Sequence, residues 1–239
     1  MKYVRSSMGS LALFLVISLG MGPTSKSNAA AQLAEVVIGD VVGNVSYSTD
    51  GTWRPLKKDM KLSHGAIIKT GANSTVDLLL HSSFSALRLT PNSSLRLDKL
   101  HREAGYDKEL TETTLTLLAG SVAGTQRKLA APSRFQINVA GEVVTIVGTE
   151  YYVRSDGAVT VISGMVSINY NLPNGSGSVK VTVSAGFTFD PTTGQVVPTT
   201  PEYLQNIIAH ITTTKQNAET FKAGGATLVV KPERYISPH

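Results

Sequence analysis

The sequence predicts an all-β protein: a compact roll or sandwich of many short, mainly antiparallel strands that ends in one C-terminal α-helix. Runs of alternating apolar and polar residues recur about every ten residues between turn signals. Charged residues make up only 16% of the 239 residues and glycine occurs 21 times, which is typical of a turn-rich β protein and not of a helical bundle or a disordered chain. Helix-start signals appear near the end of the chain, at Thr200-Pro201-Glu202.

The N-terminal residues resemble a secretory signal peptide. Lys2 and Arg5 precede an apolar run over residues 8–20, and small residues follow at the expected cleavage position, near Ala29 to Ala31. The apolar run is shorter than the roughly 20 residues that span a bilayer, although an uncleaved anchor remains the alternative. We therefore expect a protein that is secreted or periplasmic, and not an integral membrane protein once processed. The expected segments are a signal peptide at 1–31, a β domain at 32–198, and a helix with a tail at 199–239.

The first part of the β region divides into short strands. In the strand over residues 94–100, Leu95, Leu97 and Leu100 are expected on the buried face, with Arg96 and Asp98 outward. The other expected strands lie at residues 36–38, 43–47, 66–69, 75–80, 84–89, 113–118, 121–123 and 135–139.

The single tryptophan, Trp53, follows the turn Thr49-Asp50-Gly51. A large aromatic side chain at that position is expected to plug one end of the β core. The alternative is a platform on which a sugar ring stacks, but no other aromatic residue is close in the sequence.

Two charged segments are expected to be loops. Residues 101–112 (HREAGYDKELTE) mix both charges and have no β periodicity, which is typical of a solvated loop. Residues 125–134 carry Arg127, Lys128 and Arg134 around Ala130-Ala131-Pro132, and suit either an ordinary basic loop or a site for an anionic polymer.

Residues 142–168 show the clearest β pattern of the chain. Gly148, the turn Ser155-Asp156-Gly157, and Ser163-Gly164 divide this stretch into four expected strands. Gly148 is expected to allow a bulge or a close backbone approach, and the hydroxyl of Thr149 to satisfy a backbone group freed there.

The last third predicts a loop, two more strands and the helix. A loop is expected over residues 171–178, followed by strands at 179–183 and 187–189. In the helix, Leu204, Ile207, Ile208 and Ile211 lie on one face, which is expected to dock on the β domain, with binding of a partner as the alternative. Residues 227–230 can add a further strand.

The sequence offers no catalytic pattern, so we do not expect an enzyme. Cysteine is absent, and the five histidines lie in no metal-binding spacing, so no cofactor and no metal are expected. Removing Lys2, Arg5 and Lys26 with the signal peptide lowers the formal charge from +5 to +2, which gives no support for a nucleic-acid partner. Glycosidase carboxylates are conceivable, but alternation or a turn position explains each candidate: Asp77, Asp98, Glu150 and Asp156.

Several blocks of sequence, taken in order, resemble the FecR-like domain family, the envelope-side β domain of bacterial sigma-factor regulators. The blocks are Gly43-Asn44-Val45 with Trp53-Arg54-Pro55-Leu56 and residues 62–71; residues 74–78 with 87–93; residues 117–122; and residues 147–153. The Asp-Gly turn that the family usually shows is replaced by Ser82-Ser83. Only seven residues precede the hydrophobic segment, so the resemblance implies a secreted stand-alone member without the cytoplasmic anti-sigma region.

The expected function is that of a non-enzymatic, exported interaction module of the bacterial envelope. Such a module would bind a protein partner through loops, first of all 101–112 and 125–134, or through an exposed strand edge. One alternative is a polysaccharide or cell-wall binding domain with Trp53 and Tyr151 or Tyr152 as stacking residues, and a second is a cryptic hydrolase. The sequence does not identify binding residues.

Overall fold

The computed structural model describes residues 31–80, 85–104, 109–220, 222–223 and 226–227. Most of the expected signal peptide, residues 1–30, lies outside the described residues, as do 228–230 of the last expected strand. The elements are β1 (Ala31–Leu33), β2 (Val36–Val42), β3 (Val45–Ser48), β4 (Arg54–Pro55), β5 (Lys61–Leu62), β6 (Ile67–Thr70), β7 (Thr75–Leu80), β8 (Ser85–Leu89), β9 (Ser94–Ala104), β10 (Glu109–Ala119), β11 (Ser121–Gln126), β12 (Arg134–Val139), β13 (Glu142–Arg154), β14 (Val159–Asn171), β15 (Ser178–Ser184), β16 (Phe187–Asp190), β17 (Gln195–Pro198), α1 (Pro201–Thr220), β18 (Lys222–Ala223) and β19 (Ala226–Thr227).

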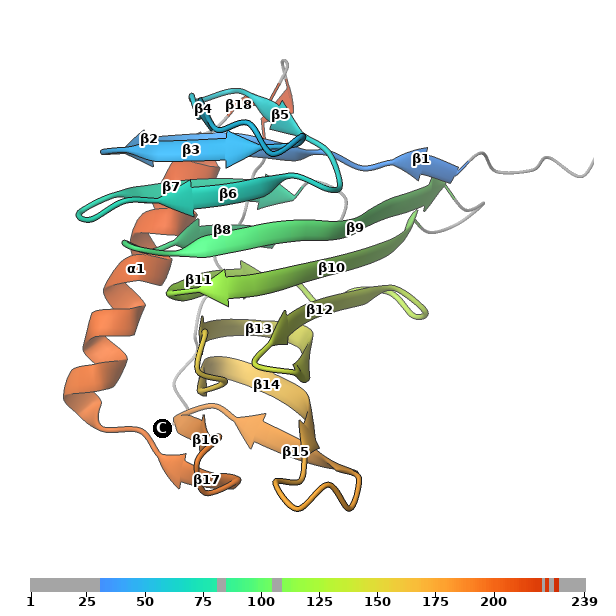
Figure 1. The fold of residues 1–239 in the computed structure, drawn as a ribbon, viewed down its shortest axis with the longest axis vertical. Helices are drawn as coiled ribbons and strands as arrows, with labels where there is room; N and C mark the ends of the chain where they lie inside the picture. Colours follow the sequence, from blue (N-terminus) through green and yellow to red (C-terminus); the bar gives the residue numbers. More distant parts are fainter. Residues whose placement is uncertain (1–30, 81–84, 105–108, 221, 224–225, 228–239) are drawn as a thin grey trace, which may run out of the picture.

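The strands β1 to β17 form one sheet that curls around a single core and presents two faces (Figure 1). The helix face runs in the order β2, β7, β8, β11, β13, β14, β16, β17. The open face runs β4, β3, β6, β9, β10, β12, β13, β14, β15. All pairs are antiparallel except β10 with β12, so the predicted roll of mainly antiparallel strands is confirmed.

At one edge of the roll, the chain passes repeatedly between the two faces through short polar turns. The backbone N–H of Gly71 donates to the carbonyl of Asn44 at 2.9 Å, and that of Asn92 donates to the carbonyl of Gly71 at 3.1 Å. Below them, the N–H of Ser121 donates to the hydroxyl of Ser93 at 2.9 Å. Each turn thus satisfies backbone groups of its neighbour, as in a solenoid whose layers contact only adjacent layers.

At the opposite edge, glycines carry β13 and β14 from one face to the other. Gly148 and Gly164 have positive φ angles of 60° and 75°, and the β13–β14 register shifts between Val147 and Glu150. The expectation of four strands over residues 142–168 is therefore wrong, because each glycine bends one continuous strand instead of ending it. The expected bulge is confirmed, and the Thr149 hydroxyl donates to the carbonyl of Ser163.

The core between the faces is mainly aliphatic, and Leu95, Leu97 and Leu100 are buried in it as predicted. Its largest fully buried side chains are Tyr151, Phe135 and Phe189.

The predicted loop over residues 101–112 is wrong. Within that segment the described residues belong to β9 and β10, which pair with each other as far as Ala104 and Glu109. The Lys99 ammonium lies 2.6 Å from the Glu112 carboxylate across the two strands. Both sides of this ribbon carry polar residues, so the period-two pattern that reveals a strand is absent. The strand β17, at Gln195–Pro198, was also missed.

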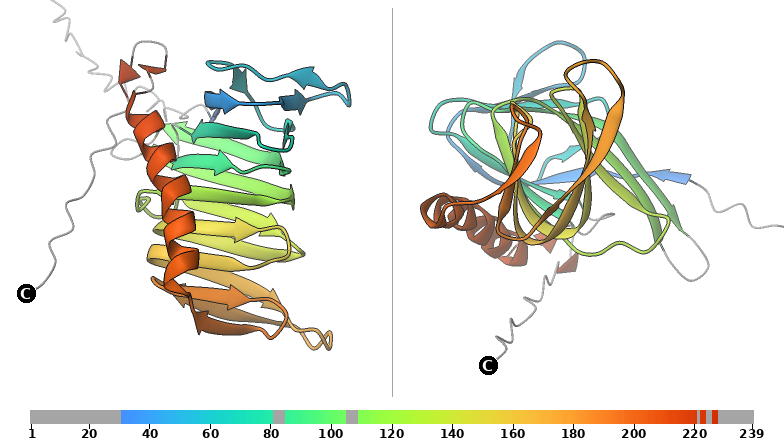
Figure 2. Two further views of the ribbon diagram at one scale, coloured as in Figure 1. Left: turned by 90° about the vertical axis from the view of Figure 1, so that its left-hand side faces the viewer. Right: turned by 90° about the horizontal axis from the view of Figure 1, so that it is seen from below.

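The helix α1 begins after Thr200, whose hydroxyl accepts the N–H of Tyr203 at 3.4 Å, as a capping residue does. It packs along the helix face against β2, β7, β8 and β11 (Figure 2). Its buried side chains are Ile207, Ile211, Thr214 and Ala218, so the predicted docking on the β region is confirmed. Among the residues that the structure describes, no helix has the length and apolar character needed to cross a membrane.

Gly164→Ala should destabilise the fold more than Gly175→Ala. Both glycines have positive φ, so either substitution is expected to cost about 1–2 kcal/mol in backbone conformation. A Cβ at position 164 would also lie 2.4 Å from the carbonyl oxygen of Gly148, whereas a Cβ at position 175 meets nothing within 4 Å. This clash should add about 1–3 kcal/mol to the loss of unfolding free energy in urea. Equal losses for the two variants would contradict the role of the glycine edge.

Candidate functional site

The four carboxylates considered as glycosidase residues are not brought together. Within the described ranges, no group of three or more His, Cys, Asp or Glu residues can hold a metal ion. Each carboxylate instead faces a cation: the pairs are Asp77 with Arg88, Asp98 with Arg96, Glu150 with Lys215, and Asp156 with Arg154.

Trp53 does not plug the core, so that prediction is wrong. Its side chain is 42% exposed, and the Lys69 ammonium lies 4.1 Å from the centre of its ring. Two leucines, Leu56 and Leu62, are buried in the core from the same part of the chain and take the place expected for the tryptophan. A cation over a tryptophan ring is favourable, but it also covers one face of the ring.

The two tyrosines proposed as sugar-stacking residues are held within the structure. Tyr151 is fully buried, and its burial raises the pKa of its hydroxyl. Tyr152 is partly buried, with its hydroxyl 2.7 Å from that of Ser121 and its ring edge-on to Tyr203. Tyr151 therefore cannot stack on a glycan.

The basic loop is confirmed over residues 127–133, between β11 and β12. Arg127 and Lys128 are exposed, and a Cβ on Gly148 would lie 2.9 Å from the Cα of Lys128. The loop is therefore held close to the glycine edge at this point.

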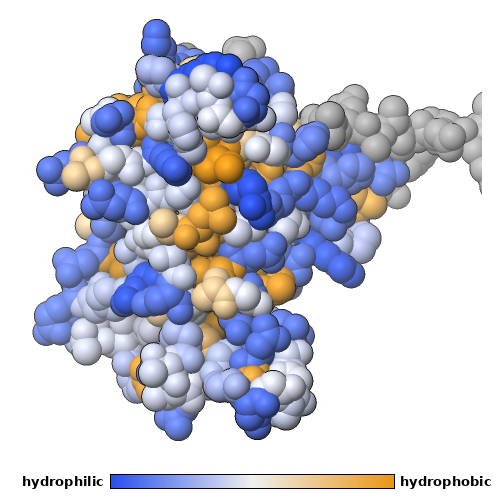
Figure 3. All heavy atoms as spheres, in the orientation of Figure 1, coloured by the Kyte–Doolittle hydropathy of each residue, from blue (hydrophilic) through white to orange (hydrophobic). Residues whose placement is uncertain are grey.

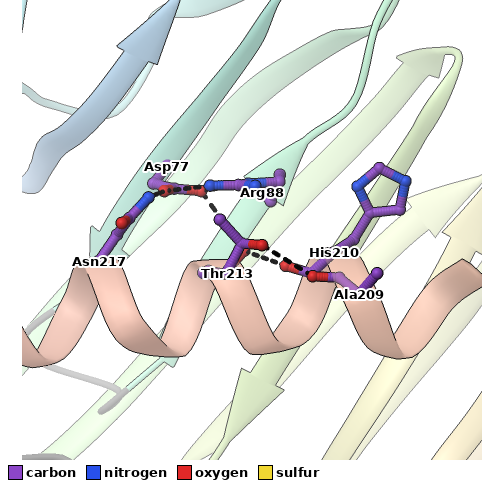
Figure 4. A network of polar contacts seen from close by, with 7 residues as sticks. Asp77, Arg88, Ala209, His210, Thr213 and Asn217 are labelled. Atoms are coloured by element: carbon purple, nitrogen blue, oxygen red, sulfur yellow. Dashed lines mark hydrogen bonds and ion pairs between the residues drawn. The ribbon is translucent and has the colours of Figure 1, made fainter.

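The most buried ionic group of the described chain lies beneath α1 (Figure 4). Two nitrogens of Arg88 donate to the Asp77 carboxylate, Nε at 2.8 Å and Nη2 at 2.7 Å. From the helix, Asn217 Nδ2 donates to the same carboxylate at 2.7 Å and Thr214 Oγ1 donates at 3.4 Å. The side chains of Asp77 and Arg88 are only 1% and 9% exposed, so this network fixes where α1 sits on the sheet.

Further contacts hold the helix in the same register. Lys215 forms an ion pair with Glu150 of β13. His210 is half-buried near Arg88, and burial together with the positive charge of Arg88 lowers the pKa of its imidazole. The imidazole is therefore neutral at neutral pH and adds no second charge beside the guanidinium.

The end of the roll that carries β15, β16 and β17 is different, because its strand edges are exposed. Within the described part of the chain, β15 pairs only with β14 and β17 pairs only with β16. Large apolar side chains are exposed on these strands: Val179 is 42%, Phe187 38% and Val197 39% exposed. We call β15 together with β17 the terminal edge; these strands lie lowest in Figure 1 and are seen from below in Figure 2.

The side of the molecule shown in Figure 3 lacks a broad apolar patch. Hydrophobic atoms form only a narrow strip there between hydrophilic areas. An unpaired strand edge is a template for another strand, so the terminal edge is the candidate site. A strand edge was among the expected binding features, but the sequence did not indicate which strand would provide it.

Arg88→Met should cost about 3–5 kcal/mol of unfolding free energy, because it leaves the buried Asp77 carboxylate without its cation. The matched control is Arg54→Met, since Arg54 pairs with Asp50 on the surface. Its urea midpoint should stay close to that of the unchanged protein. If both variants lost the same stability, the buried network would not be what anchors α1.

Comparison with known proteins supports the expected family. Residues 66–167 match the family model described as FecR protein. No curated protein matches the chain.

Two crystal structures of a protein from Parabacteroides distasonis, described provisionally as an anti-sigma factor, are similar at 14% and 12% identity. Both have a TM-score of 0.40, and the alignments cover 56% of this chain and 58% of the other. Nothing about function follows from a likeness at this level. The segment that matches the family model runs from the loop before β6 into β14 and includes both edges of the roll, so the β region of this chain is similar to the FecR family over these residues.

Proposed function

We propose that this chain is an exported, non-enzymatic protein-interaction module of the bacterial envelope, which binds a protein partner by extending its sheet at β15. The proposal of export rests on residues 1–31, which resemble a signal peptide. We also propose that residues 32–198 form the β domain and that residues 199–239 form a helix with a tail. The FecR match supports an envelope role without assigning a partner.

The observation that carries the proposal is the regularity of β15. Its seven residues pair with β14 without a register shift, and its only charged residue is Lys180. It contains neither proline nor glycine. An edge strand directs about half of its backbone N–H and C=O groups away from its neighbour, where an added strand can bond to them.

The other short edge strands of the described chain are poorer docking sites for an added strand. β1 has three residues, and β4 and β5 have two each. β17 has four residues and ends at Pro198, which has no N–H to donate. β15 is therefore the edge best suited to a partner.

A second candidate function is binding of a polysaccharide or cell-wall glycan, which only the exposed Trp53 ring favours. Trp53→Ala should then remove retention on isolated cell-wall glycan. The hydrolase alternative has less support, since the carboxylates considered for it each face a cation.

The proposal is tested by crosslinking in cells that export the full chain, with Thr182 replaced by a photoreactive phenylalanine. Thr182 is exposed on β15, and the same replacement at the exposed Ser63 serves as the position control. We expect a discrete protein adduct from position 182 and none from position 63.

Val179→Lys should abolish that adduct, because it places a charge on the apolar side of the docking edge. Val42→Lys makes the same change at a similarly exposed valine of β2, away from the terminal edge, and should leave the adduct in place. An adduct that survives Val179→Lys, or retention on glycan alone, would overturn the proposal.

A further inference from the structure

The sequence of β15 reads nearly the same in both directions. The strand is Ser-Val-Lys-Val-Thr-Val-Ser, with Val181 at its centre. Reversal exchanges Ser178 with Ser184 and Val179 with Val183, and only Lys180 and Thr182 differ. Such a strand can pair with a copy of itself in antiparallel orientation about a two-fold axis through Val181.

That pairing is chemically matched on both sides of the strand. Val179 lies opposite Val183 of the second copy, and the two Val181 side chains face each other. On the other side, Lys180 lies opposite Thr182 of the second copy, so no like charges meet. Opposed β-branched residues stabilise a sheet, and like charges directly opposite destabilise it.

The pattern of burial along β15 favours an added strand whose apolar side chains extend the hydrophobic core. Val183 is fully buried, Val181 is half-buried and Val179 is 42% exposed, although the three side chains share one side of the strand. In the paired strands, Val183 of the second copy would lie beside Val179 and cover it. The helix α1 lies on the helix face, where it contacts β2, β7, β8 and β11 and also Glu150 and Tyr152 of β13, whereas β15 lies on the open face.

A two-fold axis perpendicular to an antiparallel sheet keeps the sides of the sheet matched. The open face would therefore continue into the open face of the second copy, and β17 would approach its own counterpart. The exposed Phe187 and Val197 lie on the strands beside this junction in both copies. The surfaces that the two copies bring together at this junction are therefore both apolar.

We propose that β15 pairs with β15 of a second copy of this chain, giving a two-fold dimer whose two rolls join end to end. This inference rests on the proposed function, because it names the occupant of the same edge. The interface consists of one seven-residue strand and its neighbours from each copy, so the dimer should be weak, with a Kd on the order of micromolar.

The test is sedimentation velocity of the full chain lacking only its signal-like segment, over a wide concentration range at low salt. Thr182→Lys places a lysine opposite Lys180 of the second copy, and by symmetry does so twice. The Kd should rise about 2- to 30-fold, as expected for two cross-strand pairs. Thr182→Glu should lower the Kd by a similar factor, because each glutamate then faces Lys180.

The double variant Lys180→Glu with Thr182→Lys should restore the dimer, since opposite charges again face each other across the axis. Position 182 is exposed, so the monomer fold should be unchanged, which circular dichroism and the urea midpoint verify. The inference would be overturned if the chain stayed monomeric up to hundreds of micromolar. It would also be overturned if Thr182→Lys and Thr182→Glu gave dimers with the same Kd.

The two proposals fail in distinguishable ways. A monomeric chain that still gives a Val179-dependent adduct with a different protein would disprove self-pairing and leave the proposed function standing. A charge-sensitive dimer whose position-182 adduct contains only this chain would identify the second copy as the partner. A monomeric chain without any protein adduct would remove both.

Discussion

The fold depends on satisfying the backbone where the chain crosses between the two faces of the roll. At one edge, stacked turns bond to one another, as Gly71 does to Asn44 and Asn92. At the opposite edge, backbone crowds both crossing glycines: a Cβ on Gly148 would lie against Lys128 of the loop between β11 and β12, and a Cβ on Gly164 would lie against the carbonyl oxygen of Gly148. The two faces stay in register over one core because each crossing is fixed by the layer beside it.

The helix is held by a different kind of constraint. The Asp77 carboxylate and the Arg88 guanidinium lie on the outside of the helix face, where α1 covers them and adds donors from Thr214 and Asn217. A buried charge without partners is costly, so a helix displaced along the sheet would lose more than apolar contact. This network favours one position of α1 over others that bury similar apolar area.

The sequence predicted those parts of the fold that local pattern determines. The alternation in residues 94–100, the glycine bulge at Gly148 and the cap before α1 all appear where expected. It failed where the outcome depends on distant neighbours. In the charged run at 101–112, the described residues belong to the paired strands β9 and β10, whose two sides both carry polar residues there. Leu56 and Leu62 are buried in the core where Trp53 was expected.

The candidate site was predictable in kind but not in place. A strand edge is defined by which neighbour it lacks, and the alternating pattern of β15 does not contain that information. The Asp77 network was equally hidden, because Thr214 and Asn217 are 137 and 140 residues away from Asp77 along the chain. The sequence pattern shows which residues prefer a strand. Only the assembled roll shows which strand lies at the edge of the sheet.

The central claim is that β15 is an open edge that another strand completes. Hydrogen–deuterium exchange of the amides in Ser178–Ser184 tests it most directly, in dilute protein and then at high concentration or after addition of an identified partner. The account predicts fast exchange of the outward-facing amides in dilute protein and protection confined to this strand and its neighbours on association. Amides that are already protected in dilute protein, or protection that appears elsewhere and not in β15, would contradict it.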